Sequence, residues 1–253
     1  MLATTRPTAQ RGAPFRRPQR YTPAILHNGN MDTASTPPRV LLTGFDAFGE
    51  ARLAGPALNP SWLAVQALHA TRIAGHEVIA AQLPTRFDTS VTELMRLLRL
   101  YRPALVICVG QAGGRNALSL ERIAINVNDA RIPDNAGMQP VDTPVVAGGP
   151  TAYFSTLPIK AMLQALQDAG LAAEVSQTAG TFVCNHAFYA LMHALATQRG
   201  FRRTRGGFVH VPYLPEQGAP SLPLEDMVHG LQVAIAAALA TPNDITKSAG
   251  AVS

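Results

Sequence analysis

Short apolar runs alternate with segments of helical periodicity along most of this chain, and no other feature limits its fold as strongly. The run ALVICV at residues 104–109 contains no polar residue, which is typical of a strand buried on both faces of a sheet. Residues 39–44, 77–83, 172–176 and 207–211 also have the pattern of strands. Because strands that alternate with helices form parallel βαβ units, we predict an α/β fold with a single open, mostly parallel twisted sheet and helices on both faces.

The segments between these strands carry apolar residues at helical spacing. They predict helices over 59–69, 88–99, 157–169, 184–198 and 224–240. Asp88 is a candidate N-cap for the second of these helices. The alternation breaks between Gln111 and Pro150, a stretch rich in Gly, Asn, Asp and Arg. Since this stretch is too long for an ordinary loop, we expect it to be functional or to contain extra strands.

Length and charge indicate one folded domain with two tails. The 253 residues, 47% of them apolar, suit a single core. Six arginines and one acid lie within residues 1–39, whereas basic and acidic residues balance over 40–253. The net charge of +5 therefore belongs to the N-terminal segment, and a nucleic-acid-binding face is not indicated. We predict a disordered tail at 1–38, a catalytic domain at 39–242 and a flexible C-terminal tail at 243–253.

The cysteines and the apolar runs bear on where the protein acts. Cys108 lies in an apolar run and Cys184 beside polar residues, so these two cysteines form no disulfide framework. This favours a reducing, cytoplasmic setting. No apolar run approaches the roughly 18 residues of a membrane span, and the N-terminal segment lacks the apolar centre of a secretion signal. We expect no membrane partner.

Three residues suggest a reaction. In open α/β sheets the ligand site forms beyond the carboxyl ends of the strands, and polar clusters follow predicted strands at 43–49, 110–115 and 210–213. Cys184 stands at a predicted helix start, where unpaired N–H groups and the helix dipole favour a thiolate. His210 ends a strand, and Glu121 interrupts an apolar run. Together they supply the nucleophile, base and orienting acid of a Cys-His-acid hydrolase, without naming its substrate.

Plain structural interpretations compete with this one. A cysteine at the start of an apolar helix, such as Cys184, is more often a core residue than a nucleophile. We expect Cys108, which lies in an apolar strand, to be a core residue. A metal site on Cys184, His186 and His193 is disfavoured, because neither a CxxC pair nor a matching His/Asp set accompanies them. The glycines at 110–114 lack the spacing of a nucleotide-binding loop. We therefore expect no metal and no cofactor.

Five sequence words carry a resemblance to a known family. In chain order they are TGFDAFG, NPSW, LERIAINVNDARIPDNAG, AGTFVCNH and GFVHVPY. On these words, between about Val40 and Ala240, the chain resembles the pyroglutamyl peptidase I (pyrrolidone-carboxylate peptidase) family, cysteine peptidases that remove an N-terminal pyroglutamate. The resemblance implies a phosphorylase/hydrolase-like α/β fold and a cytoplasmic enzyme that needs no cofactor. It also implies a homo-oligomer, a tetramer or a dimer.

The resemblance further implies roles for single residues. The implied catalytic residues are Cys184 as nucleophile, His210 as base, Glu121 as third member of the triad and Arg131, which with the Cys184 N–H stabilises the oxyanion. The implied substrate-binding residues are Phe45 and Phe48, which flank the lactam ring, with Gln111 and Ile132 nearby.

Two features depart from the family pattern. Ala47, within the first motif, and Glu50, directly after it, stand where the family usually has a proline and a second glycine, and the segment 50–58 is a few residues longer. The expectation is a cysteine exopeptidase that cleaves after the N-terminal pyroglutamyl residue of peptides. The alternatives are another Cys-His-Glu amidohydrolase on the same scaffold, or a protein that binds a lactam without turnover.

Overall fold

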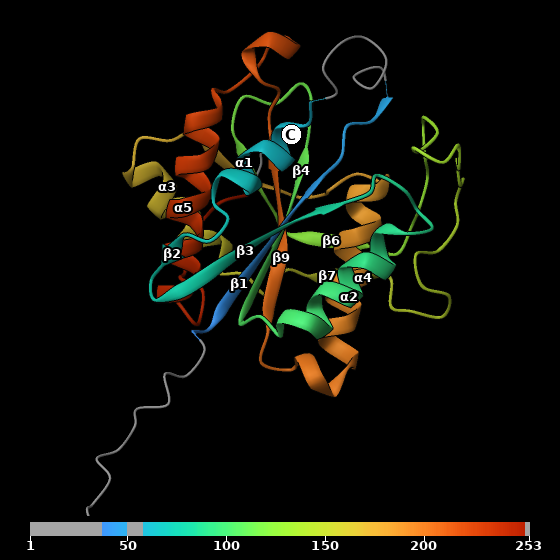
Figure 1. Cartoon of the computed structure of the whole chain (residues 1–253), viewed down its shortest axis with the longest axis horizontal. Helices are drawn as coiled ribbons and strands as arrows, with labels where there is room; N and C mark the ends of the chain where they lie inside the picture. Colours follow the sequence, from blue (N-terminus) through green and yellow to red (C-terminus); the bar gives the residue numbers. More distant parts are fainter. Residues whose placement is uncertain (1–36, 50–57, 251–253) are drawn as a thin grey trace, which may run out of the picture. The chain divides into compact units, whose positions relative to one another are not determined.

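A seven-stranded sheet forms the centre of the fold, and helices cover both of its faces (Figure 1). The computed structural model describes residues 37–49 and 58–250. The strand order is β2-β3-β1-β4-β9-β5-β8. The predicted α/β class with an open, mostly parallel sheet is therefore confirmed. Nearly all of the expected N-terminal tail and of the longer 50–58 segment lies outside the described residues.

Each predicted strand and helix is present, with its ends within two residues of the predicted ones, whereas β2 and β7 were not predicted. The strands of the main sheet are β1 (Arg39–Phe45), β2 (Arg72–Ile73), β3 (His76–Leu83), β4 (Leu105–Gln111), β5 (Leu118–Glu121), β8 (Ala173–Ser176) and β9 (Arg205–Val211). A separate pair consists of β6 (Ile123–Ile125) and β7 (Ala152–Phe154). The helices are α1 (Pro60–Ala67), α2 (Ser90–Tyr101), α3 (Ile159–Asp168), α4 (Val183–Thr197) and α5 (Leu224–Ala240).

Both edges of the sheet depart from the parallel direction: β2 is antiparallel to β3 at one edge, and β5 reverses the chain direction at the other. β1 runs parallel to β3 and β4, and β4 runs parallel to β9. β5 is antiparallel to β9, and β8 is parallel to β5. Only residues 112–117 separate β4 from β5, and this is too short for the crossover helix that a parallel return needs. Both β5 and β6 lie between Gln111 and Pro150, so the expectation of extra strands there is confirmed.

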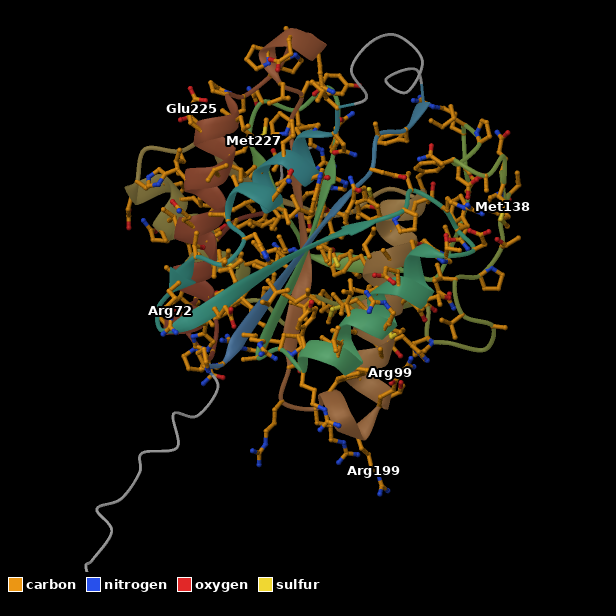
Figure 2. The ribbon with its side chains drawn as sticks, viewed as in Figure 1. Arg72, Arg99, Met138, Arg199, Glu225 and Met227 are labelled. Atoms are coloured by element: carbon orange, nitrogen blue, oxygen red, sulfur yellow. The ribbon has the colours of Figure 1, made fainter. Side chains whose placement is uncertain are left out.

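Alternate residues of the central strands feed two separate cores. Leu42, Ile107 and Val209 belong to the core on the α1, α3 and α5 face, whereas Leu41 and Phe208 belong to the core on the α2 and α4 face. Figure 1 shows these two groups of helices on opposite sides of the sheet. On α5, as Figure 2 shows, Met227 points toward the sheet and Glu225 away from it. The helices thus bury one apolar stripe each, as their periodicity predicted.

The predicted cap of α2 is wrong. Thr89 occupies the N-cap and makes no side-chain hydrogen bond to the helix. Asp88 instead accepts two hydrogen bonds from the Arg86 guanidinium, at 3.1 and 2.8 Å. Because a guanidinium can satisfy both carboxylate oxygens together, it competes successfully with a single backbone N–H.

The segment 243–250, expected to be part of a flexible tail, contacts α3. The side chain at the N-cap of α3, Pro158, cannot accept a hydrogen bond, and Asp244 takes its place. The Asp244 carboxylate accepts from the backbone N–H of Lys160 at 3.0 Å and of Ala161 at 2.9 Å. Anions are favourable at such a helix terminus. The division at 242/243 remains a prediction.

Candidate active site

The loop after β1 is joined to the start of α1 by close backbone contact. A Cβ on Gly44 would lie 2.6 Å from the Trp62 Cα, so only glycine lets α1 approach the strand this closely. Asn59 caps α1 by accepting from the Ser61 N–H at 3.0 Å. The Ser61 hydroxyl in turn accepts from the Phe45 N–H at 3.1 Å. The segments 43–49 and 59–62 are therefore held together rigidly at the carboxyl edge of the sheet.

Asp46 ties these segments to two other parts of the chain. Its Oδ1 accepts from the Thr85 N–H, after β3, at 2.6 Å. The same oxygen accepts from the Asn135 side chain at 3.0 Å, and Asn135 also donates to the Ala47 carbonyl at 2.9 Å. Because Asn135 belongs to the stretch between β4 and β7, these contacts hold that irregular stretch against the sheet edge.

Aromatic rings gather where α4 begins. Phe45 is buried, and its ring centroid lies 6.3 Å from that of Phe208 on β9. The half-buried Phe48 lies 5.9 Å from Phe182, the N-cap residue of α4, which also meets Phe87 edge-on at 5.5 Å. Phe45 and Phe48 therefore form an apolar, aromatic wall beside the first turn of α4.

Cys184 lies in the first turn of α4, against the end of β4. A Cβ on Gly110 would come within 2.8 Å of the Cys184 Sγ, so the absent side chain makes room for the sulfur. Gly110 is paired with His210 in the parallel β4–β9 ladder, and paired residues of neighbouring strands point to the same face. The sulfur therefore lies on the face that His210 occupies. Phe182 offers no side-chain cap, which leaves the first-turn N–H groups of α4 available.

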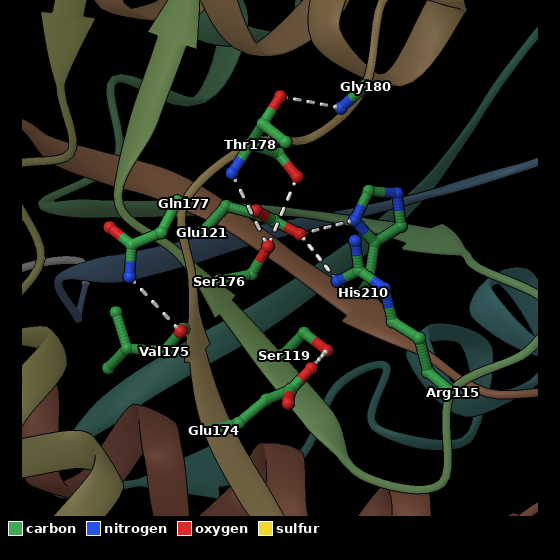
Figure 3. A network of polar contacts seen from close by, with 10 residues as sticks. All are labelled: Arg115, Ser119, Glu121, Glu174, Val175, Ser176, Gln177, Thr178, Gly180 and His210. Atoms are coloured by element: carbon green, nitrogen blue, oxygen red, sulfur yellow. Dashed lines mark hydrogen bonds and ion pairs between the residues drawn. The ribbon is translucent and has the colours of Figure 1, made fainter. Parts of the chain in front are cut away.

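His210 is bound to a buried acid (Figure 3). Its Nδ1 lies 2.7 Å from the Glu121 Oε1, and the Arg115 Nη1 donates to the same oxygen at 2.9 Å. The Glu121 side chain has 0% exposure. Its other oxygen, Oε2, has no hydrogen-bond partner among the described residues. Among those residues no hydrogen bond joins the His210 ring to the Cys184 sulfur. The acid therefore fixes the ring while the second ring nitrogen stays available.

Arg115 is a site residue to which the sequence analysis gave no role. It follows β4 at the end of the polar cluster 110–115 and precedes the buried acid by six positions. Its side chain is 26% exposed and reaches inward to Glu121. The available signal was the unpaired acid itself, because a carboxylate in an apolar run calls for a cationic partner nearby.

The expected bias of Cys184 toward thiolate is not what the structure gives. Burial raises the pKa of the Cys184 thiol from 9.0 to about 12; the charge of Glu121 acts in the same direction, and Arg115 opposes it. A helix terminus contributes about 0.3–1 kcal/mol, which is less than one pKa unit. Desolvation therefore outweighs the dipole and favours the protonated thiol.

The polar residues next to the thiol hold α4 in place. Asn185 is fully buried; its Oδ1 accepts from the Ile125 N–H at 3.0 Å, and its amide donates to the Ile125 and Val127 carbonyls, both at 2.9 Å. Asn185 thus completes the hydrogen bonding of β6. His186 lies 3.0 Å from the Asn128 side chain, and burial lowers its pKa to about 4. A ring that is neutral and already bonded is structural, so Asn185 and His186 position the turn that carries Cys184.

The remaining expected residues lie farther out. Gln111 is half-buried and accepts from the Gln217 side chain at 3.4 Å. Ile132 is 38% exposed, and its Cδ1 lies 3.8 Å from where a Cβ on Gly49 would stand. Arg131 is exposed and makes no polar contact with another described residue. The structure thus brings Cys184, His210 and Glu121 to one neighbourhood and leaves Arg131 at the surface.

The described residues hold no competing metal site. Within 37–49 and 58–250 no group of three or more His, Cys, Asp or Glu side chains could hold a metal ion. His193, weighed as a ligand, lies 3.0 Å from the Tyr153 hydroxyl instead. Two surface hollows adjoin α3 and the C-terminal segment, and neither is lined by an expected site residue.

Across the same two ranges, every helix falls short of the length and apolar content required to cross a membrane.

The fold and the site together define a class of protein. A thiol at a helix start, beside a histidine that an acid orients, at the carboxyl ends of parallel strands, is the arrangement of a cysteine-dependent hydrolase on an α/β scaffold. A comparison with models of protein families matches residues 38–241 to the family described as pyroglutamyl peptidase. The chain belongs to the pyroglutamyl peptidase family of cysteine peptidases.

Individual relatives support this assignment. The pyrrolidone-carboxylate peptidase of Cupriavidus taiwanensis is 55% identical over 218 residues, which is 84% of this chain and 98% of the relative. The crystal structure of Bacillus amyloliquefaciens pyroglutamyl peptidase I is 45% identical with a TM-score of 0.78, covering 82% of this chain and 100% of that one. Pyrrolidone carboxyl peptidase from Thermococcus litoralis has the same TM-score of 0.78 at 32% identity, covering 83% and 99%.

Proposed function

We propose that this protein hydrolyses the amide bond after an N-terminal pyroglutamyl residue of peptides, with Cys184 as nucleophile, His210 as base and Glu121 as the acid that orients the base. The observation that carries the proposal is the buried contact of 2.7 Å between the His210 Nδ1 and the Glu121 Oε1, on the sheet face that α4 covers with the Cys184 thiol. Membership of the pyroglutamyl peptidase family supports the choice of substrate.

The hydrogen bond to Glu121 determines what His210 can do. A carboxylate accepts only, so it places the proton on Nδ1 and leaves Nε2 as the nitrogen that can take a proton from Cys184. Because burial favours the protonated thiol, His210 removes its proton as the sulfur attacks the pyroglutamyl carbonyl. The contact between thiol and ring then tightens when substrate is bound, as catalytic hydrogen bonds commonly do.

The two half-reactions use the same groups. Attack forms the Sγ–C bond and an oxyanion, which the Cys184 N–H and the Arg131 guanidinium stabilise. Collapse of this intermediate breaks the C–N bond, and His210 gives its proton to the departing amine. Water, deprotonated by His210, then attacks the thioester. The C–S bond breaks, pyroglutamate is released, and His210 returns the proton to the sulfur. The chemistry uses no cofactor.

Selection of the lactam follows from the apolar wall. Pyroglutamate has no charged α-amine, so its flat ring can lie against Phe45 and Phe48 without burying a charge. A free N-terminal amine there would lose its hydration, and even a neutral polar group left unpaired costs roughly 2–7 kcal/mol. Gln111 and Ile132 complete the edge of this pocket.

An arylamide assay tests the proposal. The purified protein is given pyroglutamyl, prolyl and alanyl arylamides at equal concentration. We expect release of the amine from the pyroglutamyl compound alone. Turnover of the others instead would identify a different Cys-His-Glu amidohydrolase, and saturable binding without any turnover would identify a lactam-binding protein.

The assembly and cellular setting are also part of the proposal. We infer a cytoplasmic homo-oligomer, a tetramer or a dimer, that binds neither nucleic acid nor membrane. Large exposed apolar side chains, among them Phe154 at 68% and Val141 at 63% exposure, are the kind that a subunit interface covers. Light scattering of the full chain measures the subunit number, and a monomer at micromolar concentration would contradict this part.

A further inference from the structure

Glu121 receives two hydrogen bonds on one oxygen, and they come from different parts of the chain. His210 reaches it from β9, and Arg115 reaches it from the loop after β4 (Figure 3). The neighbouring arginine, Arg122, points elsewhere: it donates to the Gln177 side chain at 2.8 Å and to the Ala249 carbonyl. Only Arg115 among these arginines therefore touches the proposed catalytic acid.

We propose that Arg115 is a positioning residue of the peptidase, which pairs with the buried Glu121 carboxylate and holds it in place so that Glu121 orients His210 toward Cys184. The inference rests on the proposed function and adds to it a residue that contacts neither substrate nor thiol.

The burial of Glu121 makes such a partner necessary. A carboxylate without solvent contact is destabilised in its charged form, and a neutral imidazole compensates this only in part. The guanidinium supplies the missing charge while its donor geometry suits a carboxylate.

The loop that carries Arg115 is held in a defined conformation. The Ala112 N–H donates to the Val211 carbonyl at 2.9 Å, which extends the β4–β9 ladder by one bond. A Cβ on Gly113 would lie 2.3 Å from the Tyr213 hydroxyl, so the Tyr213 ring packs directly on the loop backbone. Gly114 has φ of +81°, a conformation that favours glycine. These features give Arg115 a fixed starting point for its reach to Glu121.

The charges that face the thiol give an independent readout. Glu121 on β5 and Cys108 on β4 act to raise the pKa of Cys184, and Arg115 acts to lower it. Loss of the Arg115 charge should therefore move alkylation of Cys184 to higher pH, in addition to loosening Glu121 and His210. A residue that only stabilised the loop would not produce this shift.

The test compares Arg115→Gln, Arg115→Lys and the matched control Arg122→Gln. Each change is made in the full chain carrying Cys108→Ala, so that Cys184 is the only thiol. The measurements are kcat and KM for a pyroglutamyl arylamide, the pH midpoint of Cys184 alkylation by iodoacetamide, and the thermal melt. We expect Arg115→Gln to lose roughly tenfold to a hundredfold in kcat with KM within about threefold, and to raise the alkylation midpoint.

Arg115→Lys should lie between wild type and Arg115→Gln in kcat, because it restores the charge but not the planar guanidinium that reaches the Glu121 Oε1. Arg122→Gln should stay within about twofold of wild type. If Arg115→Gln does not fold, the lysine variant decides: an intermediate kcat at unchanged KM supports the proposal, and a wild-type kcat overturns it.

Wild-type kcat in a folded Arg115→Gln, an unchanged alkylation midpoint, or an equal loss in Arg122→Gln would each overturn the positioning role. Failure of the proposed function would look different. The wild-type protein would then turn over no pyroglutamyl substrate, while the alkylation midpoints would still report whether Arg115 acts on the Glu121–His210–Cys184 group.

Discussion

The parallel strands β3, β1, β4 and β9 and the irregular stretch between Gln111 and Pro150 contribute different parts of one site. The strands and the helix α4 supply the thiol, the base and the buried Phe45. The irregular stretch supplies Glu121, Arg115, Arg131 and Ile132, which orient the base or lie at the rim. The regular scaffold thus carries the proposed reacting groups, and the irregular stretch carries the groups proposed to orient them.

The two regions are also held together in different ways. Alternating apolar side chains fix the strands between two cores. The apolar side chains of β5 in the irregular stretch also enter a core, but the rest of that stretch is fixed by single polar contacts, chiefly those of Asn185 with β6 and of Asp46 with Asn135. In a site divided in this way, the residues that orient the base can be changed without changing the strands that carry the proposed nucleophile and base. The following predictions challenge that division, beginning with the largest expected effect.

Replacing the nucleophile should remove activity altogether. Cys184→Ser is expected to lower kcat/KM for a pyroglutamyl arylamide by at least about 10⁴, whereas Cys108→Ala should keep most of it. Burial raises the pKa of both thiols to about 12, so position and not acidity distinguishes them. Loss of labelling by iodoacetamide in Cys184→Ser alone checks the assignment. Equal activity loss in both variants would contradict it.

Glu121→Gln should separate catalysis from thiol ionisation. Activity is expected to fall roughly 10- to 10³-fold, because the amide no longer fixes the His210 ring as a carboxylate does. The charge of Glu121 acts to raise the pKa of Cys184, so its removal should move the alkylation midpoint to lower pH.

The measurements for Glu121→Gln are kcat/KM and the pH dependence of Cys184 alkylation, with a thermal melt as control for folding. A midpoint that moves to higher pH would mean that the thiol rests as an ion pair with His210. Unchanged activity in a normally folded variant would reduce the triad to Cys184 and His210.

Arg131→Ala tests the irregular stretch without disturbing it. Because Arg131 is exposed and makes no polar contact with other described residues, stability should change by less than about 0.5 kcal/mol. We expect kcat to fall roughly 10- to 10²-fold through loss of oxyanion stabilisation, with Arg131→Lys in between. A lowered melting temperature, or a change in KM alone, would give Arg131 a different role.

Removal of residues 1–36 should have the smallest effect. The family match begins at residue 38, and every proposed site residue follows it. We expect kcat/KM for a small substrate to stay within a few-fold of the full chain, since an Arg- and Pro-rich segment has few apolar groups with which to dock. Steady-state kinetics of the truncated and full chains, measured side by side, check this. A tenfold loss would assign the segment to the site or to the assembly.

Much of this molecule follows from its sequence. The strand and helix positions follow from local periodicity, and Cys184, His210 and Glu121 were predicted as catalytic residues from their residue types and places along the chain. Arg115 escaped notice because nothing local distinguishes an arginine in a polar loop from a solvated one. The cap of α2 was misassigned for a related reason, since Asp88 had a competing partner in Arg86.

The tertiary structure decided the direction of β5, the pairing of Arg115 with Glu121 and the direction in which the Cys184 pKa is shifted. Each of these depends on what surrounds a group in space. Strand direction depends on which neighbour offers a free edge, and the charge state of a buried group depends on the balance between lost hydration and nearby charges. The sequence by itself determined the elements, their apolar faces and the order of the reactive residues, because periodicity and residue chemistry are local properties of the chain.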